Sequence, residues 1–350
     1  MISPLRRPVL EVRKAGLLDS VQDLGRPGQA AIALSRGGAM DRDAFTLANA
    51  LVGNPAWAAG LEITGPGPTV CVHCDTWLAS VGADHGVSAS DGQTGSRFVP
   101  MKTQRPVFVR AGSVLRWQSP QAGWRSWLAV AGGLDMPKVM DSRSAHLAAG
   151  IGPQRIAAGQ QLALAEDAEA LAHVRAQCVL GPLEEAVVGR GPRWQLAGNL
   201  PHTWPHIDMP VLPGRHLHAL SNSARERLLN QTWKVSAQSN RQGLRLQGEP
   251  IETSGLPQLA SEPVCFGTVQ LPPGGEPVIL LAEHQTTGGY PRVLEVASAA
   301  EGLLAQAGAG CLIRFRLIGL DEADALAQQQ ARMLRQRLIG IEQACRYPTT

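Results

Sequence analysis

The sequence predicts a mainly β protein with a few helices, and composition gives the first reason. The chain has 350 residues, 44% of them hydrophobic, which is enough to bury a large core and to build two domains or one two-lobed unit. Its 38 glycines and 25 prolines are more than a helical bundle tolerates. Such frequent turn residues favour many short strands, as in barrels and sandwiches.

The apolar pattern supports the same fold class. Short strand-like runs separated by turn residues occur at 61–64, 70–72, 77–79, 107–109 and 114–117. A proline–glycine turn, a buried strand, a Gly-Gly pair and a proline occur in this order twice, at 120–137 and at 273–291. This short internal repeat indicates two related β-rich lobes with a cleft between them.

Helical segments are expected in three places. Asp41 is a good N-cap for a helix whose apolar side includes Phe45 and Leu51, and Gly53 begins the turn that ends it. A second helix is expected near 221–232, and an amphipathic one at 322–345. Residues 165–178 are typical of a short helix or a surface connection. The predicted domains are an N-terminal lobe at 1–195, a linker at 196–214, a C-terminal lobe at 215–320 and a C-terminal helix at 321–350.

Charge and composition argue against two classes of partner. Aromatic residues make up only 4% of the chain, too few for platforms that stack on nucleic-acid bases. The net charge of +3 is small and the arginines are scattered, so neither a nucleic-acid stripe nor a membrane patch is expected. No apolar run approaches the ~18 residues that span a bilayer. The basic N-terminus has no apolar segment behind it, so we expect no signal peptide and a cytoplasmic location.

Two absences narrow the chemistry. Cys71 and Cys74 flank His73, but no second pair completes a zinc site, so packing cysteines are expected and no metal site is evident. There is no Gly-Lys dipeptide and therefore no P-loop. If the protein handles ATP, it does so without a familiar phosphate cradle, or a partner supplies one.

The most informative segment is 283–291, which follows the apolar run 277–282. It places an acid, an imidazole, an amide and two hydroxyls before Gly-Gly-Tyr-Pro. Adjacent glycines let the backbone approach a ligand closely, and polar groups at the end of a buried strand are a common way to build a site. His284 is a candidate general acid or base if it faces the cleft. The alternative is an ordinary strand-to-turn exit.

Two segments near the N-terminus are further candidates. Gln22, Asp23 and Arg26 share one tight loop, where Asp23 is expected to hold Arg26 ready for an anionic substrate. The alternative is a surface turn with a weak local ion pair. Gly37 and Gly38 lead into the helix that begins after Asp41, where free N–H groups favour anions. Here Asp41 can equally be a simple helix cap.

Two further polar clusters are candidate binding sites. Ser142 and Arg143 form a small cluster that can bind an anion or be an ordinary loop. In a strand, Arg241 and Arg245 share one face and need a counter-charge, from Glu252, Glu262 or a bound anion. Ser239 and Asn240 add neutral hydrogen-bonding groups beside them. The alternative is a solvated edge strand.

Seven motifs occur in an order that resembles one family. They are Gln22-Asp23-Leu24-Gly25-Arg26, Gly38-Ala39-Met40-Asp41 with Asn49, Leu61-Glu62-Ile63, Leu128-Ala129-Val130-Ala131-Gly132-Gly133, Ser142-Arg143-Ser144, Ser239-x-Arg241-x-Gly243-x-Arg245-Leu246, and Gln285-Thr286-Thr287-Gly288-Gly289-Tyr290-Pro291. From about residue 10 to residue 315, the chain is similar to the biotin-dependent carboxyltransferase-like family. This family includes the C subunit of bacterial ATP-dependent 5-oxoprolinase, the Kip-type antagonist of a sporulation kinase inhibitor, and the carboxyltransferase part of urea amidolyase.

The resemblance implies two cyclophilin-like β-barrel lobes in a pseudo-duplicate arrangement. It also implies an enzyme component that opens 5-oxoproline to glutamate with ATP, together with the A subunit of 5-oxoprolinase and a Kip-inhibitor-like B subunit. The residues expected to be catalytic are Glu283, His284, Gln285 and Thr287. Those expected to bind substrate are Gln22, Asp23, Arg26, Asp41, Ser142, Arg143, Ser239, Asn240, Arg241, Arg245, Thr286, Gly288, Gly289 and Tyr290.

The chain departs from the usual family pattern in several places. Asn240 stands where an acid is expected, and Glu283-His284 stands where Asp-Arg is expected. Asp141 replaces a glycine and Ala145 a threonine. Asn240 removes a charge and leaves an amide hydrogen bond. These changes bear on substrate identity more than on fold.

Two other functions stay open on the sequence alone. One is carboxyl transfer from carboxybiotin to urea or a small amide. Because the chain has no Ala-Met-Lys-Met sequence, the biotin carrier would come from elsewhere. The other is a non-catalytic antagonist that binds a Kip-inhibitor-like partner.

Overall fold

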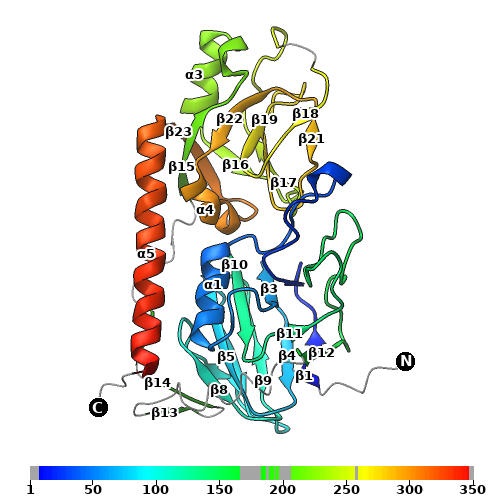
Figure 1. Ribbon diagram of the computed structural model, residues 1–350, viewed down its shortest axis with the longest axis vertical. Coiled ribbons are helices and arrows are strands. Elements are labelled where there is room, and N and C mark those ends of the chain that lie inside the picture. The colour runs from blue at the N-terminus through cyan, green and yellow to red at the C-terminus, as the bar shows by residue number, and fades with distance from the viewer. Residues whose placement is uncertain are drawn as a thin grey trace.

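The fold is mainly β, as the sequence predicts. The computed structural model describes residues 8–165, 183–186, 189–192, 194–196, 206–256 and 259–346. The strands of residues 8–192 form two sheets, here called the sheet body, and seven of the strands of residues 206–317 form a closed barrel. Figure 1 shows the barrel above the sheet body, with the long C-terminal helix α5 running beside both.

The sheet body consists of two seven-stranded sheets around one core. The first sheet has the order β11-β12-β1-β4-β9-β6-β7 and the second β13-β14-β8-β5-β10-β3-β2, and the pairs are antiparallel. The first is built from β11 (Leu134–Asp135), β12 (Gln161–Leu164), β1 (Pro8–Lys14), β4 (Thr69–Val72), β9 (Val114–Arg116), β6 (Ser88–Ser90) and β7 (Val99–Pro100). The second is built from β13 (Leu183–Ala186), β14 (Gly189–Pro192), β8 (Val107–Val109), β5 (Thr76–Asp84), β10 (Ala122–Val130), β3 (Gly60–Thr64) and β2 (Ser20–Gln22). Their inward apolar side chains form one cluster, which includes Leu10, Ile63 and Leu128.

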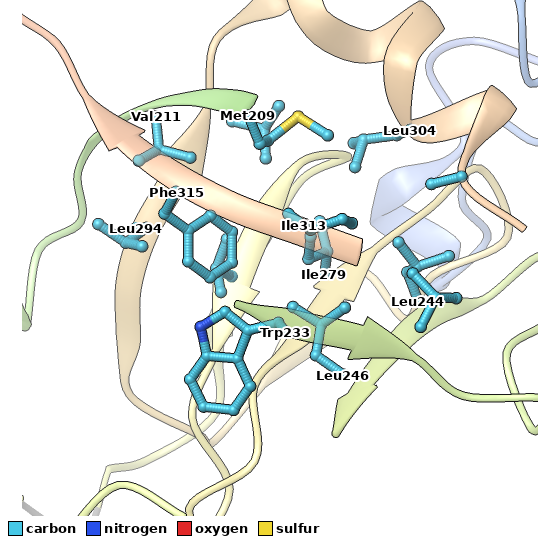
Figure 2. Close-up of a cluster of buried hydrophobic side chains, with 14 of the residues drawn as sticks. Met209, Val211, Trp233, Leu244, Leu246, Ile279, Leu294, Leu304, Ile313 and Phe315 are labelled. Carbon is cyan, nitrogen blue, oxygen red and sulfur yellow. The ribbon is translucent and has the colours of Figure 1, made fainter. Parts of the chain in front are cut away.

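The barrel closes seven strands in the order β15-β22-β19-β20-β17-β16-β23. They are β15 (His206–Pro213), β22 (Arg292–Val296), β19 (Thr268–Gln270), β20 (Val278–Leu280), β17 (Gly243–Gln247), β16 (Trp233–Val235) and β23 (Leu312–Leu317). A separate pair, β18 (Glu262–Pro263) and β21 (Thr287–Gly288), lies beside it. Figure 2 shows the buried side chains that fill the barrel, with Trp233, Ile279 and Phe315 among them.

One part of the predicted linker is wrong. Residues 206–213 of the predicted linker form β15, which pairs with β22 and runs parallel to β23. Alternate residues Ile207, Met209 and Val211 are buried in the barrel core, so this segment is an integral strand. Proline content suggested a linker, but Pro210 and Pro213 are tolerated within and at the end of this strand. The predicted segment 165–178 lies, apart from residue 165, outside the described residues.

The predicted helices occur where the sequence places them. α1 (Arg42–Leu51) is capped by Asp41, whose carboxylate accepts from Ala44 N at 3.0 Å. α3 (Asn222–Asn230) is capped in the same way by Ser221, and α5 (Leu320–Arg346) is the C-terminal helix. The structure adds α4 (Glu301–Gln306) and the 3₁₀ turns η1 (Ala30–Ile32), η2 (Leu217–Ala219) and η3 (Ser298–Ala300). Within the described ranges, no helix combines the length and hydropathy of a membrane span.

Met40 joins the sheet body to the barrel. It immediately precedes the N-cap of α1, yet its side chain is buried in the hydrophobic cluster of the barrel. Around this apolar anchor, the two bodies meet through buried polar and charged groups.

Candidate functional site

A buried bridge of three charged residues joins the barrel to the sheet body. Arg241 is 2% exposed, and all three of its guanidinium nitrogens donate hydrogen bonds. Nε donates to Glu283 at 2.5 Å, Nη1 to Glu62 of β3, and Nη2 to the carbonyl of Gly38 at 2.6 Å. Burial opposes the charge of Arg241, but the two carboxylates outweigh it and raise its pKa. The Glu62–Arg241–Glu283 bridge therefore fixes how the two bodies dock.

The bridge corrects the expected arrangement of the two arginines. Arg241 lies before β17 rather than within it, and it is buried, whereas Arg245 within β17 is exposed. They do not share a face. The counter-charges of Arg241 are Glu62 and Glu283 instead of the expected Glu252 or Glu262.

The polar contact continues from Glu62 toward α4. Arg125 of β10 lies 3.8 Å from Glu62 and donates from Nη1 to the carbonyl of Ala305 at 2.7 Å. Gln306 accepts from the backbone N–H groups of Trp124 and Arg125 and donates to Asp41 at 2.9 Å. Burial lowers the pKa of Arg125 to about 10 and raises the pKa of Asp41 to about 6. Asp41 is thus a helix cap, which was one of the two predictions for it. It is also a contact between the two bodies.

Asp23 organises the loop that contains Ser142. Its Oδ1 accepts from the hydroxyls of Ser142 at 2.7 Å and Ser144 at 2.5 Å, and from Gly25 N at 2.8 Å. Its Oδ2 accepts from Arg143 N at 2.6 Å. Asp23 therefore does not hold Arg26 by a hydrogen bond, contrary to expectation, although its charge still favours the guanidinium cation at longer range.

Arg26 is instead held by backbone carbonyls. It is 1% exposed, Nε donates to Val139 O at 3.3 Å, and Nη2 donates to Ser144 O at 2.6 Å. Nη1 is buried and makes no hydrogen bond in the structure. Burial lowers the pKa of Arg26, and the charges of Asp23 and Glu283 partly offset this effect. Its remaining N–H groups are available to an acceptor.

His146 and Ser35 lie beside Arg26 and Glu283. Ser35 Oγ is 2.9 Å from His146 Nε2, and Ala149 N donates to His146 Nδ1 at 3.2 Å. Glu283 Oε2 lies 3.9 Å from the same Nδ1 and accepts from Ala148 N at 2.9 Å. Burial lowers the pKa of His146, so its neutral form is favoured.

The sequence did not identify these neighbours as site residues. The sequence pattern could have indicated Glu62 as a buried acid, because it stands between Leu61 and Ile63 in an apolar strand. No sequence pattern indicated Ser35 or His146 as site residues, because they are separated by 111 positions and belong to no motif.

The 284–290 segment lies on the surface of the barrel. His284 is partly buried, its Nδ1 is 2.5 Å from Gln285 O, and burial lowers its pKa. Gln285 is exposed, and its side chain donates to Gln270 at 3.1 Å. Thr287 and Gly288 form β21, while Tyr290 is 47% exposed.

The remaining predicted residues have local contacts. Ser239 Oγ accepts from Arg245 N at 3.0 Å, and Asn240 Oδ1 accepts from Gln242 N at 2.8 Å, so both organise the turn before β17. Gln22 is buried and donates to Ser20. Arg143 pairs with Asp135 at 3.2 Å. The backbone carbonyl of Thr286 accepts from Val264 N at 3.0 Å, and Gly289 is partly buried.

Two groups stand out among the predicted residues. Arg26, Arg241 and Glu283 converge at the junction of the two bodies. Residues 284–290 follow Glu283 directly but lead to the surface, and no hydrogen bond joins Arg26 or Arg241 to Thr287. Among the described residues, no group of three or more histidine, cysteine or acidic side chains could hold a metal ion.

Comparison with known proteins agrees with this architecture. Residues 32–317 match the family model described as carboxyltransferase domain, subdomain A and B. The chain belongs to this family. It is 36% identical to the C subunit of 5-oxoprolinase from Escherichia coli (strain K12), over 94% of this chain and 97% of the relative. It is 30% identical to the corresponding 5-oxoprolinase component of Haemophilus influenzae, over 89% and 91%.

A solved structure shares the fold. The crystal structure of Kluyveromyces lactis urea carboxylase superimposes with a TM-score of 0.78 and 25% identity, covering 96% of this chain and 30% of that one. The family expectation drawn from the seven motifs is confirmed. The fold class is confirmed as well, with one closed barrel and a body of two sheets.

Proposed function

We propose that this chain is the counterpart of the C subunit in an ATP-dependent 5-oxoprolinase, which opens 5-oxoproline to glutamate together with partner proteins. The near-full-length match to the Escherichia coli C subunit carries the proposal, because both chains are covered almost completely. As partners we propose a Kip-inhibitor-like B subunit and the A subunit of the same enzyme. We place the complex in the cytoplasm.

The junction between the two bodies is our candidate for the site. Ring opening requires an activated lactam carbonyl and a positioned nucleophile. Glu283 is buried and bonded to Arg241 and Ala148, so we assign it to positioning the segment that follows rather than to moving a proton. His284, whose pKa burial lowers, and Thr287 belong to the segment that leads from the junction to the surface, so we assign them to proton transfer and substrate contact at the outer edge of the site.

ATP chemistry is assigned to the complex and not to this chain alone. The sequence has no P-loop, so we propose that a partner protein provides most of the phosphate cradle. Any ATP bound by this chain would therefore lie where it meets its partners.

Reconstitution tests the proposal. The chain is co-expressed with both candidate partners, and glutamate release from 5-oxoproline is measured with and without ATP. We expect glutamate only when all three chains and ATP are present. An assembled complex that binds neither 5-oxoproline nor nucleotide by calorimetry contradicts the proposal.

A second candidate is carboxyl transfer to urea or another small amide with a separate biotin carrier. The similarity to urea carboxylase over 96% of the chain favours it. Carboxylation of urea by the chain, supplied with carboxybiotin, is the distinguishing measurement. Transfer to urea without ATP-dependent glutamate release supports this candidate over the first.

A further inference from the structure

Arg26 contains a buried donor that the fold does not use. Nε and Nη2 are bonded to the carbonyls of Val139 and Ser144, but Nη1 has no partner and almost no contact with solvent. An unpaired buried donor costs about 1–3 kcal/mol, and more when the group is charged. Natural structures satisfy most buried polar groups, so an exception indicates a bound water, an ion or a ligand group.

The space beside Nη1 is kept open by a glycine. Gly37 has φ +63°, and a β-carbon there would lie 3.7 Å from Arg26 Nη1 and 3.2 Å from His146 Cδ2. A side chain would therefore cover the unpaired edge of the guanidinium and press on the imidazole. Without a side chain at Gly37, no β-carbon stands between the two groups, but Nη1 is closed to solvent, so a ligand enters only when the surrounding chain shifts.

Ser35 supplies a second donor next to this space. Because Ala149 N donates to Nδ1 of His146, the ring proton lies on Nε2 and is donated to Ser35 Oγ. The hydroxyl hydrogen of Ser35 is therefore free to point elsewhere. Nε2 and Cδ2 are adjacent ring atoms, so Ser35 and the space at Gly37 lie along the same edge of the imidazole.

The surrounding charge favours an uncharged acceptor. Three arginines, Arg26, Arg125 and Arg241, are matched or exceeded by the acids along this junction, Asp23, Asp41, Glu62 and Glu283. A phosphate dianion would add uncompensated charge in a buried place, which is costly. A carbonyl oxygen adds no net charge and accepts two hydrogen bonds.

We propose that Arg26 Nη1 and the hydroxyl of Ser35 bind one amide carbonyl oxygen of the substrate, and that His146 is a positioning residue that orients Ser35. This site adds a substrate contact to the proposed function, and the identity of the ligand rests on that function. A lactam and urea both have an amide carbonyl of this kind. Negative charge that develops on the oxygen strengthens both hydrogen bonds, so the site activates the carbonyl as well as binding it. Because Nη1 is shielded from solvent, binding requires part of the surrounding chain to move.

Titration calorimetry on the full chain tests the site without the partner proteins. The probes are 2-pyrrolidinone, 5-oxoproline, urea and inorganic phosphate. We expect at least one amide to bind and phosphate neither to bind nor to compete. Ser35→Ala should weaken amide binding by about three- to tenfold, the value of one hydrogen bond. Arg26→Lys should weaken it by at least about tenfold, because an ammonium cannot replace the planar fork.

Further variants separate the site from a general loss of structure. Ser88→Ala removes another buried hydroxyl outside the junction and should bind like the wild type. His146→Gln should weaken binding as Ser35→Ala does, and the double variant should be no weaker than either single one. Additive losses would show that His146 does not act through Ser35. Circular dichroism and thermal melting confirm that each variant is folded.

Two results on the isolated chain would overturn the site. One is unchanged amide binding by Ser35→Ala and Arg26→Lys, both folded. The other is a crystal structure with the bound amide elsewhere and only a water between Arg26 and Ser35. If the reconstituted complex is active and Ser35→Ala changes neither its KM nor its kcat, the carbonyl site is wrong but the proposed function stands. If urea binding depends on Arg26 and Ser35 but the reconstituted complex releases no glutamate, the carbonyl site stands and the 5-oxoprolinase function is rejected.

Discussion

Arg241 of the barrel donates a hydrogen bond to Glu62 in the second sheet of the sheet body, across 179 positions of sequence. Both side chains are almost fully buried. A buried ion pair of this kind adds little net stability, because desolvation offsets the attraction, but it fixes geometry. Here it sets the position of Glu283, and with it the start of the segment 284–290, relative to the sheet body.

Replacing Arg241 should therefore be costly. Arg241→Met keeps much of the volume but leaves Glu62 and Glu283 buried with no cation between them, so we expect a loss of about 3–5 kcal/mol in the free energy of unfolding. Chemical denaturation measures it. Arg245→Met, in the same motif but exposed, is the matched control and should change stability by less than about 0.5 kcal/mol. Equal effects of the two substitutions would show that the bridge does not hold the junction.

Asp41 should make stability depend on pH. Its folded-state pKa is raised by burial from 3.8 to about 6, so the folded protein binds more protons than the unfolded chain between these values. The free energy of unfolding should fall as pH rises through this window, by about 3 kcal/mol from this group. Asp41→Asn keeps a capping side chain but cannot titrate. The difference between wild type and variant, measured by denaturation at several pH values, should change across the window and be constant above it. A constant difference throughout contradicts the prediction.

Asp23 should be necessary for the loop that carries Ser142 and Ser144. Asp23→Asn replaces one acceptor oxygen by an NH₂ group facing donors, so at least one of its hydrogen bonds is lost, at about 1–3 kcal/mol. Because Ser144 also positions Arg26, amide binding should weaken with stability. Asp141→Asn in the same loop is the control, since its side chain is exposed and Asn tolerates its positive φ of 61°. Full stability and binding in Asp23→Asn would show that this carboxylate does not organise the loop.

Gly288 and Gly289 should respond differently to alanine. A β-carbon at Gly288 would lie 2.4 Å from Gln270 Nε2, so Gly288→Ala must displace the buried side chain that accepts from Gln285. At Gly289 the nearest atom is 3.3 Å away, which a small shift accommodates. We expect Gly288→Ala to lower kcat/KM of the reconstituted complex by at least about tenfold, and Gly289→Ala to have a smaller effect. The reverse order would indicate that Gly289, and not Gly288, sets the shape of the segment.

The sequence by itself determined the local elements and the family. Asp41 and Ser221 marked two helix starts, turn residues and short apolar runs indicated the strands, and the ordered motifs identified the carboxyltransferase-domain family. These features depend on hydrogen bonds and periodicities within a few residues, which spacing along the chain reveals. The same reasoning was wrong at 206–213, where prolines occur in a strand that the rest of the barrel stabilises.

Only the tertiary structure decided which charges meet. Arg241 pairs with Glu62 and Glu283 rather than with acids nearer to it in the sequence. Asp23 accepts hydrogen bonds from Ser142 and Ser144, 119 and 121 positions away, and Ser35 lies against His146. The partner of a buried charge or polar group is set by how segments far apart in the sequence pack together, within the sheet body as well as between the two bodies, and no local periodicity encodes that contact. For the same reason, the unpaired edge of Arg26 is visible only in the tertiary structure.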